Sequence, residues 1–195
     1  MDGMDWMASA MRAAQTQLET ATHNLANVAS DGFRRVRSTL ALTPRGLVAS
    51  ESQDGAQGGI RQTGRPLDLA LIGPGQFRVG NVATRDGAFV RDRDGYLADR
   101  QGRRVAGIGG PIRLADDAVI GPDGVIRNGA VIAGRLPLPT GTTVRSGALE
   151  SSGVDAIGET LAVLTAQRAS ETAQKTLVAI DQTRDKAVND VARLK

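Results

Sequence analysis

The stretch that decides the fold runs from residue 4 to residue 28 and reads MDWMASAMRAAQTQLETATHNLANV. Its apolar side chains recur at alternating steps of three and four residues, the a/d spacing of a coiled-coil seam. The seam comprises Met4, Met7, Met11, Ala14, Leu18, Ala21, Leu25 and Val28. Ser30-Asp31-Gly32 then supplies a stop, since glycine suits the left-handed position after a helix. The pattern therefore predicts a helix from about Met4 to Ala29.

The C-terminal segment carries a similar pattern. Ser152 and Asp155 resemble a capping box, and only Gly158 interrupts the helix formers that follow. Small and apolar residues, mostly alanine, recur every three or four positions. We expect one helix from about Val154 to Leu194, which at about 1.5 Å per residue spans on the order of 60 Å. That length exceeds the width of a domain built from the rest of the chain, so part of the helix needs a partner.

The two terminal helices are each other's obvious partners, as an intramolecular coiled coil. Alanine contributes little burial, so an isolated pair of this composition is marginal and frayed. Packing of many copies side by side would stabilise it. The alternative is a plain helical hairpin that closes a globular domain.

Between these ends the chain changes character. All 24 Gly except Gly3 and Gly158 lie there, with all seven Pro. Short apolar runs alternate with turns about every 8–12 residues, which suggests a small sandwich or barrel-like β unit. Gly121-Pro122-Asp123-Gly124 between two Val-Ile pairs is a strong hairpin signal. We expect an α+β chain whose long terminal helices pair as a coiled coil around a small all-β middle domain.

Composition excludes several classes of protein. The chain of 195 residues has no Cys, which excludes disulfides and thiolate metal sites. It has no apolar run long enough for a transmembrane helix, and Asp2 and Asp5 argue against a cleavable secretory signal. Charges of both signs are interspersed around a net charge of +3, and stacking aromatics are scarce, so nucleic-acid binding is disfavoured.

Catalytic constellations are also missing from the sequence. His23, the only His, sits on the polar flank of the N-terminal helix. Asp92-Arg93-Asp94-Gly95 resembles the start of a calcium loop, but Tyr96 and Leu97 break that pattern and favour a turn. Gly73-Pro74-Gly75 lacks the third glycine and the helix of a dinucleotide loop. We expect no enzyme activity, no cofactor and no metal.

Five segments resemble motifs of flagellar rod and hook proteins, in the family's order. The first two are Leu25-Ala26-Asn27-Val28 with Asp31-Gly32-Phe33-Arg34-Arg35, and Thr63-Gly64-Arg65-Pro66-Leu67-Asp68-Leu69-Ala70-Leu71-Ile72-Gly73-Pro74-Gly75. The third is Thr84-Arg85-Asp86-Gly87-Ala88-Phe89, followed by Asp92 and Asp94-Gly95-Tyr96-Leu97. The last two are Gly147-Ala148-Leu149-Glu150-Ser151-Ser152, and Ala166-Gln167-Arg168-Ala169 with Glu171 and Lys175. His23, Gln76, Gly153 and Ser170 depart from the family pattern, two of them where an aromatic is usual.

The resemblance implies a structural subunit of the flagellar rod, of the proximal or distal type. Such subunits stack helically into the axial drive shaft that carries torque from motor to hook across the periplasm. Their partners are copies of themselves, other rod and hook subunits, and the flagellar export apparatus, which exports them without a cleaved signal. No nucleic acid and no direct membrane insertion are implied.

The resemblance and the periodicity together give an expected division of the chain. Residues 1–31 form the N-terminal helix of a core domain, 32–62 an extended linker or loop, 63–151 a β-rich domain, and 152–195 the C-terminal helix of the core. The expected assembly interface comprises Met4, Met7, Met11, Ala14, Leu18, Ala21, Leu25, Asn27, Val28, Leu161, Leu164, Gln167, Arg168, Leu177, Ile180, Val191 and Leu194. The alternative function is a secreted β-domain adhesin or binding module that is oligomerised by its terminal helices.

Overall fold

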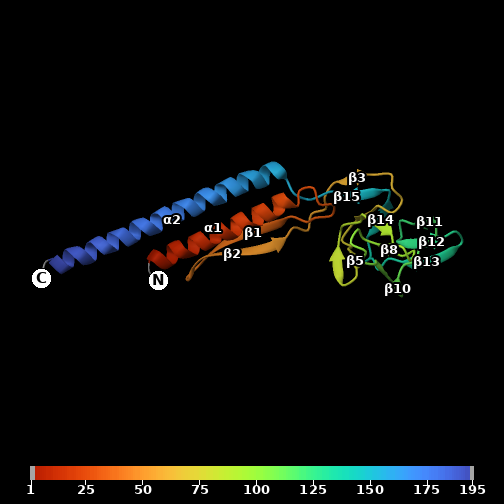
Figure 1. Cartoon of the computed structure of the whole chain (residues 1–195), viewed down its shortest axis with the longest axis horizontal. Coiled ribbons are helices and arrows are strands. Elements are labelled where there is room, and N and C mark those ends of the chain that lie inside the picture. Colours follow the sequence, from red (N-terminus) through yellow and green to blue (C-terminus); the bar gives the residue numbers. More distant parts are fainter. Residues whose placement is uncertain (1–2, 194–195) are drawn as a thin grey trace. The chain divides into compact units, whose positions relative to one another are not determined.

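A computed structural model describes residues 3–193 of the chain. It has a long helix near each end, α1 (Gly3–Ala26) and α2 (Ala156–Arg193), with short antiparallel strands between them (Figure 1). The α+β class with terminal helices is therefore confirmed.

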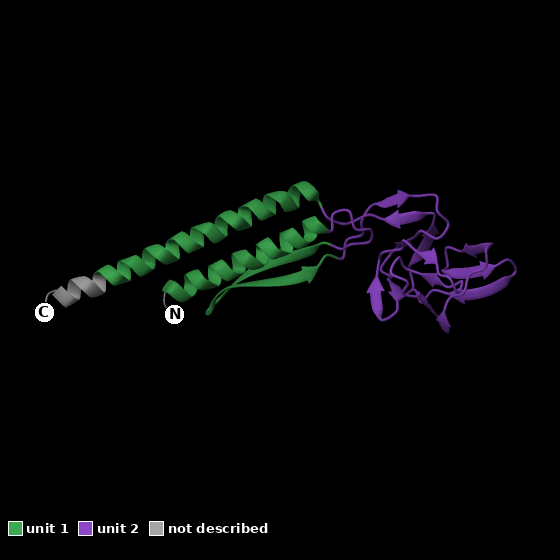
Figure 2. Ribbon diagram, viewed as in Figure 1, with its two compact units in different colours: residues 1–26, 35–54, 155–195 green, residues 27–34, 55–154 purple. Residues whose placement is uncertain are grey.

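The chain divides into two compact units, coloured separately in Figure 2. Unit 1 consists of residues 1–26, 35–54 and 155–195, and thus holds both helices and one hairpin. Unit 2 consists of residues 27–34 and 55–154 and holds the remaining strands.

Helix α1 ends at Ala26, three residues before the predicted end. The amide of Ser30 donates to the carbonyl of Asn27, and the Ser30 hydroxyl donates to the Asn27 side-chain oxygen. Such local bonds compete with the helix and favour a turn. Gly32 has a φ of 69°, but a Cβ there would lie 2.3 Å from the carbonyl carbon of Arg85. Gly32 is thus left-handed as predicted, but it lies beyond the turn at Asn27–Ser30 that ends α1, and it is also required for close backbone approach within unit 2.

Asp155 caps the start of α2. Its carboxylate accepts the backbone amides of Ile157 and Gly158, each at 3.2 Å. Ser152 instead accepts the amide of Val154. The predicted capping pair is therefore corrected to a single aspartate cap, which satisfies two of the free amides of the first turn.

The segment 36–53 differs from the extended linker expected over 32–62. Strands β1 (Val36–Thr43) and β2 (Gly46–Gln53) pair antiparallel over their full length. Ser38 and Glu51 face one another on the side turned toward α1, because Glu51 accepts the hydroxyl of Thr20. Polar residues on the covered face remove the alternation by which a half-buried strand is recognised in sequence.

Unit 2 is built from short strands joined by tight turns. They pair antiparallel as β14–β4, β15–β3, β5–β6, β7–β8, β10–β9 and β11–β12–β13. Their bounds are β3 (Ile60–Gln62), β4 (Leu69–Ile72), β5 (Phe77–Val79), β6 (Val82–Thr84), β7 (Val90–Arg91), β8 (Leu97–Ala98), β9 (Ala106–Gly107), β10 (Gly110–Pro111), β11 (Ala118–Ile120), β12 (Val125–Asn128), β13 (Val131–Arg135), β14 (Thr143–Ser146) and β15 (Ala148–Glu150). The predicted hairpin at Gly121-Pro122-Asp123-Gly124 is confirmed as the β11–β12 connection.

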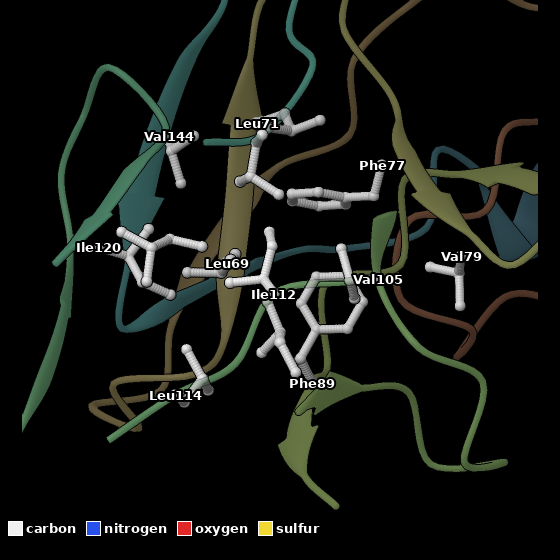
Figure 3. Packing of buried hydrophobic residues seen from close by; sticks show 13 residues of the cluster. Leu69, Leu71, Phe77, Val79, Phe89, Val105, Ile112, Leu114, Ile120 and Val144 are labelled. Atoms are coloured by element: carbon white, nitrogen blue, oxygen red, sulfur yellow. The ribbon is translucent and has the colours of Figure 1, made fainter. Parts of the chain in front are cut away.

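Mostly aliphatic side chains from β4, β5, β8, β11, β12 and β14 and from the loops between strands form one core, drawn in Figure 3. Phe77 and Phe89 meet edge to face in it, with ring centroids 4.9 Å apart. Leu69, Leu97 and Ile126 are fully buried around them. Two aromatics thus suffice because aliphatic residues supply most of the buried area.

The Asp92-Arg93-Asp94-Gly95 segment is a turn, as predicted. The Asp92 carboxylate accepts the backbone amides of Asp94 and Tyr96, and the other oxygen accepts the guanidinium of Arg104 at 2.9 Å. The bond from the Tyr96 amide and the contact with Arg104 lower the pKa of Asp92. The carboxylate oxygens of Asp92 are therefore occupied by hydrogen bonds that stabilise the turn.

A buried ion pair joins Arg85, which follows β6, to Glu150 of β15 in unit 2. The side chains of Arg85 and Glu150 are 1% and 2% exposed and lie 2.7 Å apart. Arg85 also donates to the carbonyls of Gly73 and Gly75, and Glu150 accepts the amide of Gly58. The pair is thus fully hydrogen-bonded, the condition under which burial of two charges is tolerated.

We expect Arg85→Met to destabilise unit 2 by about 3–5 kcal/mol, because it leaves the Glu150 charge buried without a partner. Urea unfolding followed by circular dichroism measures this free energy. Arg61→Met is the matched control, since Arg61 pairs with Asp31 at the surface and such pairs contribute about 1 kcal/mol or less. Equal effects of the two substitutions would contradict the assignment.

Candidate assembly surface

Among the described residues, no group of three or more His, Asp or Glu side chains is placed to hold a metal ion. Within the same residues, neither helix combines the length and hydropathy needed to cross a membrane. His23 is exposed on α1. The described residues therefore offer no metal-binding group, and we take the surface formed by the helices of unit 1 as the candidate site.

Helix α1 is the centre of unit 1, because both the hairpin and α2 contact it. On the hairpin side, the amide of Leu47 in β2 donates to the Ser9 hydroxyl at 3.1 Å. Helix α2 runs antiparallel to α1, since Arg184 reaches the Met4 sulfur at 2.6 Å and Glu159 bonds to Asn24 at the other end. The two helices thus lie side by side along α1 (Figure 1).

A buried polar cluster joins all three elements of unit 1. The Asn24 side chain is 1% exposed and both accepts the amide of Val36, at 2.9 Å, and donates to its carbonyl, at 2.7 Å. It also donates to Glu159, which is 2% exposed. The Glu159 carboxylate is paired with Arg35, which lies just before β1. Within this cluster, the side chains of Asn24 and Glu159 are therefore both hydrogen-bonded.

The face of α1 that is buried inside the chain is not the predicted seam. The buried residues are Ser9, Ala13, Ala14, Thr20, Ala21 and Asn24. At about 100° per residue, the mean direction of these buried residues around the axis of α1 differs from that of the seam by roughly a quarter of a turn. Only Ala14 and Ala21 belong to both sets. The larger seam residues Met4, Met7, Met11, Leu18 and Leu25 are partly exposed.

The remaining residues of the expected interface lie in three different settings. Asn27 is partly buried and Val28 is 37% exposed, and both belong to unit 2. On α2, Leu161, Leu164, Gln167 and Arg168 are exposed, whereas Leu177 and Ile180 are partly buried. Val191 and Leu194 lie outside the residues whose side chains are described.

Sequence reasoning missed the residues on which unit 1 closes. Hydropathy favours the Met and Leu stripe, but the buried contact uses Ser, Thr, Asn and Ala, because two layers approach α1 closely there. Ser9, Ala13, Thr20 and Asn24 are themselves spaced by four, seven and four residues. That heptad-compatible pattern of small residues was the available signal.

A groove runs along α1 between β1 and α2. Its volume is about 610 Å³, and its lining includes Thr20, Asn24, Ser38, Leu161 and Thr165. A second hollow of about 310 Å³ follows on the same flank of α2, beside Thr176 and Ile180. Unit 1 therefore has uncovered surface at the partly exposed seam residues of α1 and at the two hollows along α2.

Comparison with known proteins gives one consistent group of relatives. Residues 145–190 match the family model described as the C-terminal region of flagellar basal body rod FlgEFG proteins. Flagellar basal-body rod protein FlgG of Agrobacterium fabrum is 26% identical over 245 aligned positions, covering 90% of this chain and 94% of the relative. Flagellar basal-body rod protein FlgF of Mesorhizobium japonicum is 32% identical over 149 positions, 67% of this chain and 61% of the relative.

Hook proteins match over a shorter range. Flagellar hook protein FlgE of Brucella abortus is 33% identical over 129 positions, 58% of this chain but 31% of the relative. The alignment with the Agrobacterium protein is longer than this chain of 195 residues. The relative therefore has residues at 50 or more aligned positions where this chain has a gap, since 245 exceeds 195 by 50.

We expect Asn24→Ala to destabilise unit 1 by about 2–4 kcal/mol, because the amide and carbonyl of Val36 lose their buried partner and Glu159 loses a donor. Amide hydrogen exchange at Val36 and denaturant unfolding of unit 1 measure the effect. Thr22→Ala, at an exposed position of the same helix, is the control and changes stability by less than about 0.5 kcal/mol. Unchanged exchange at Val36 in Asn24→Ala would refute the bridging role of Asn24.

Proposed function

Since this chain belongs to the family of flagellar rod and hook proteins, we propose that it is a structural subunit of the bacterial flagellar rod, polymerising helically into the drive shaft between motor and hook. The similarity to rod proteins over 90% of the chain carries the proposal. The matched relatives are named as rod or hook proteins, so the adhesin alternative has no support.

The surface of unit 1 supports an assembling role. Helix α2 exposes Ile157, Leu161, Leu164 and Val178, which are 76%, 59%, 48% and 54% exposed. The first three are spaced by four and three residues and so share one face. A contiguous apolar patch of this kind on a folded unit is typical of a protein interface.

Burial of the α1 seam by a neighbouring subunit would stabilise the terminal helices, so we expect these helices to become fully ordered on assembly. Full burial of a Met or Leu side chain stabilises by about 1.5–3 kcal/mol, and the partly exposed seam residues of α1 would gain part of that from a neighbour. A few such side chains per subunit amount to a sizeable fraction of an ordinary domain's net stability of about 5–15 kcal/mol. In this proposal the terminal helices pair as a coiled coil fully only within the polymer.

The division of labour along the chain follows from the same proposal. Residues 1–31 and 152–195 form the assembling core, and residues 63–151 form a separate β-rich domain. The hairpin β1–β2 belongs with the core, since it contacts α1. The partners are copies of this chain, other rod and hook subunits, and the export apparatus that delivers the chain without signal cleavage. The subunit works at the basal body as a rigid mechanical element.

The proposal is tested in the source bacterium by deletion of the gene and complementation. The intact chain is expected to restore swimming and to fractionate with purified basal bodies. Leu18→Asp is expected to abolish both, because Leu18 would become buried against a neighbouring subunit in the polymer, where a charge costs several kcal/mol per contact. Arg12→Asp, at an exposed position outside the seam, is the matched control and should retain function. Normal motility of the deletion strain would refute the rod assignment.

A further inference from the structure

The hairpin of unit 1 has one strand edge without a partner strand. In an antiparallel pair, every second residue of a strand directs its backbone amide and carbonyl away from the other strand. Thr43 and Gly46 are partners across the tight turn of the hairpin, which makes Thr43 a hydrogen-bonded position. The even-numbered residues of β1 therefore direct their backbone groups to its outer edge, and these residues are Val36, Ser38, Leu40 and Leu42.

The first of these four residues is already bonded. The amide and the carbonyl of Val36 both bond to the side chain of Asn24 on α1, which agrees with an outward direction of the even-numbered positions. Among the described residues, no hydrogen bond reaches the outward backbone groups of Ser38, Leu40 or Leu42. We call residues 38–42 the open edge of β1.

The open edge begins inside the groove of unit 1. The groove is lined there by Ser38 of β1, Thr20 of α1 and Leu161 of α2. The Ser38 hydroxyl oxygen is buried, yet it has no hydrogen-bond partner among the described residues. Past the groove the edge continues along Leu40 and Leu42, which are 44% and 73% exposed. Space, unpaired backbone groups and uncovered apolar side chains thus follow one another along a single strand.

The open edge also lacks the features that usually keep a strand edge unpaired. Proteins commonly protect such an edge with a charged side chain, a proline or a β-bulge. Residues 38–42 read STLAL, without a charge or a proline. Their register with β2 is continuous, so no bulge turns the edge away. A row of unpaired donors and acceptors beside a groove is the arrangement to which an extended peptide adds as a strand.

We propose that the open edge of β1 binds an extended segment of another polypeptide, which adds to the hairpin as a further strand. The backbone groups of Ser38, Leu40 and Leu42 form the hydrogen bonds, and Asn24 ends the pairing at Val36. The site therefore selects a segment about as long as the open edge, without a proline among the bonded positions. Apolar side chains are favoured opposite Leu40 and Leu42, because cross-strand neighbours on one face contact each other.

The hairpin of a second copy is a poor occupant of this site. Pairing of the same edge from two copies is isologous and closes as a dimer, whereas the rod is an open array. This exclusion rests on the proposed rod function. The outer edge of β2 is a poor donor too, because the Leu47 amide already donates to Ser9 of α1. The occupant is therefore a segment of a different protein.

Binding of a synthetic peptide to the full chain tests the open edge. The probe is a short peptide of alternating Thr and Val, N-methylated at every second residue so that one backbone edge alone can form hydrogen bonds. We expect it to slow amide hydrogen exchange at Ser38, Leu40 and Leu42 by about tenfold or more, and to leave exchange at Thr39 and Ala41 unchanged. The same peptide N-methylated at every residue is the matched control and should not bind.

A pair of substitutions gives a second readout. Leu40→Pro removes one outward amide and no bond to β2, since proline is tolerated at a strand edge. Leu40→Ala, the matched control, loses the same side chain but keeps the amide. We expect Leu40→Pro to bind the singly edged peptide at least about tenfold more weakly than Leu40→Ala does, with both variants folded by circular dichroism. If Leu40→Pro fails to fold, the two peptides on the unaltered chain decide.

The outcomes separate the open edge from the proposed function. Equal binding of the two peptides would overturn the site, and so would slow exchange at Ser38, Leu40 and Leu42 in the free chain. Self-association of the chain that Leu40→Pro abolishes and Leu40→Ala retains would place a second copy in the site and overturn the assignment to a different protein. None of these results bears on the rod function, which motility and basal-body fractionation test.

Discussion

The buried carboxylate of Glu159 is the constraint on which unit 1 depends. A charge at 2% exposure is tolerated only with partners, and here the partners are Arg35 and Asn24. Asn24 belongs to α1, Arg35 precedes β1, and Glu159 stands in the first turn of α2. These three elements can therefore close only in the arrangement that brings the side chains together, and that arrangement sets the register of α2 along α1.

Much the same logic holds in unit 2, where Arg85 and Glu150 are the buried pair. Asp68, 1% exposed, is paired with Arg65 there. The segments that resemble rod and hook motifs contain Asp68, Arg85 and Glu150. The segments that resemble the family motifs thus coincide with polar contacts that hold unit 2 together.

Because unit 1 buries small and polar residues of α1, the large apolar side chains of that helix remain partly exposed. Met7, Met11 and Leu18 stay partly exposed, and the Ala and Thr flank of α2 stays largely open. Under the proposed rod function, neighbouring subunits would cover these exposed side chains.

The sequence by itself determined the two terminal helices, the turn-dense β region and the family. These follow from local properties: a 3–4 spacing over three heptads, glycine and proline confined to the middle, and short motifs such as Leu67-Asp68-Leu69-Ala70. Only the tertiary structure decided which face of α1 is buried, that residues 36–53 form a hairpin, and that Asp155 rather than Ser152 caps α2. Hydropathy ranks side chains by size and polarity. The choice of buried face depended instead on how closely layers can approach and on partners such as Val36 and Glu159, which are remote in sequence and become neighbours only on folding.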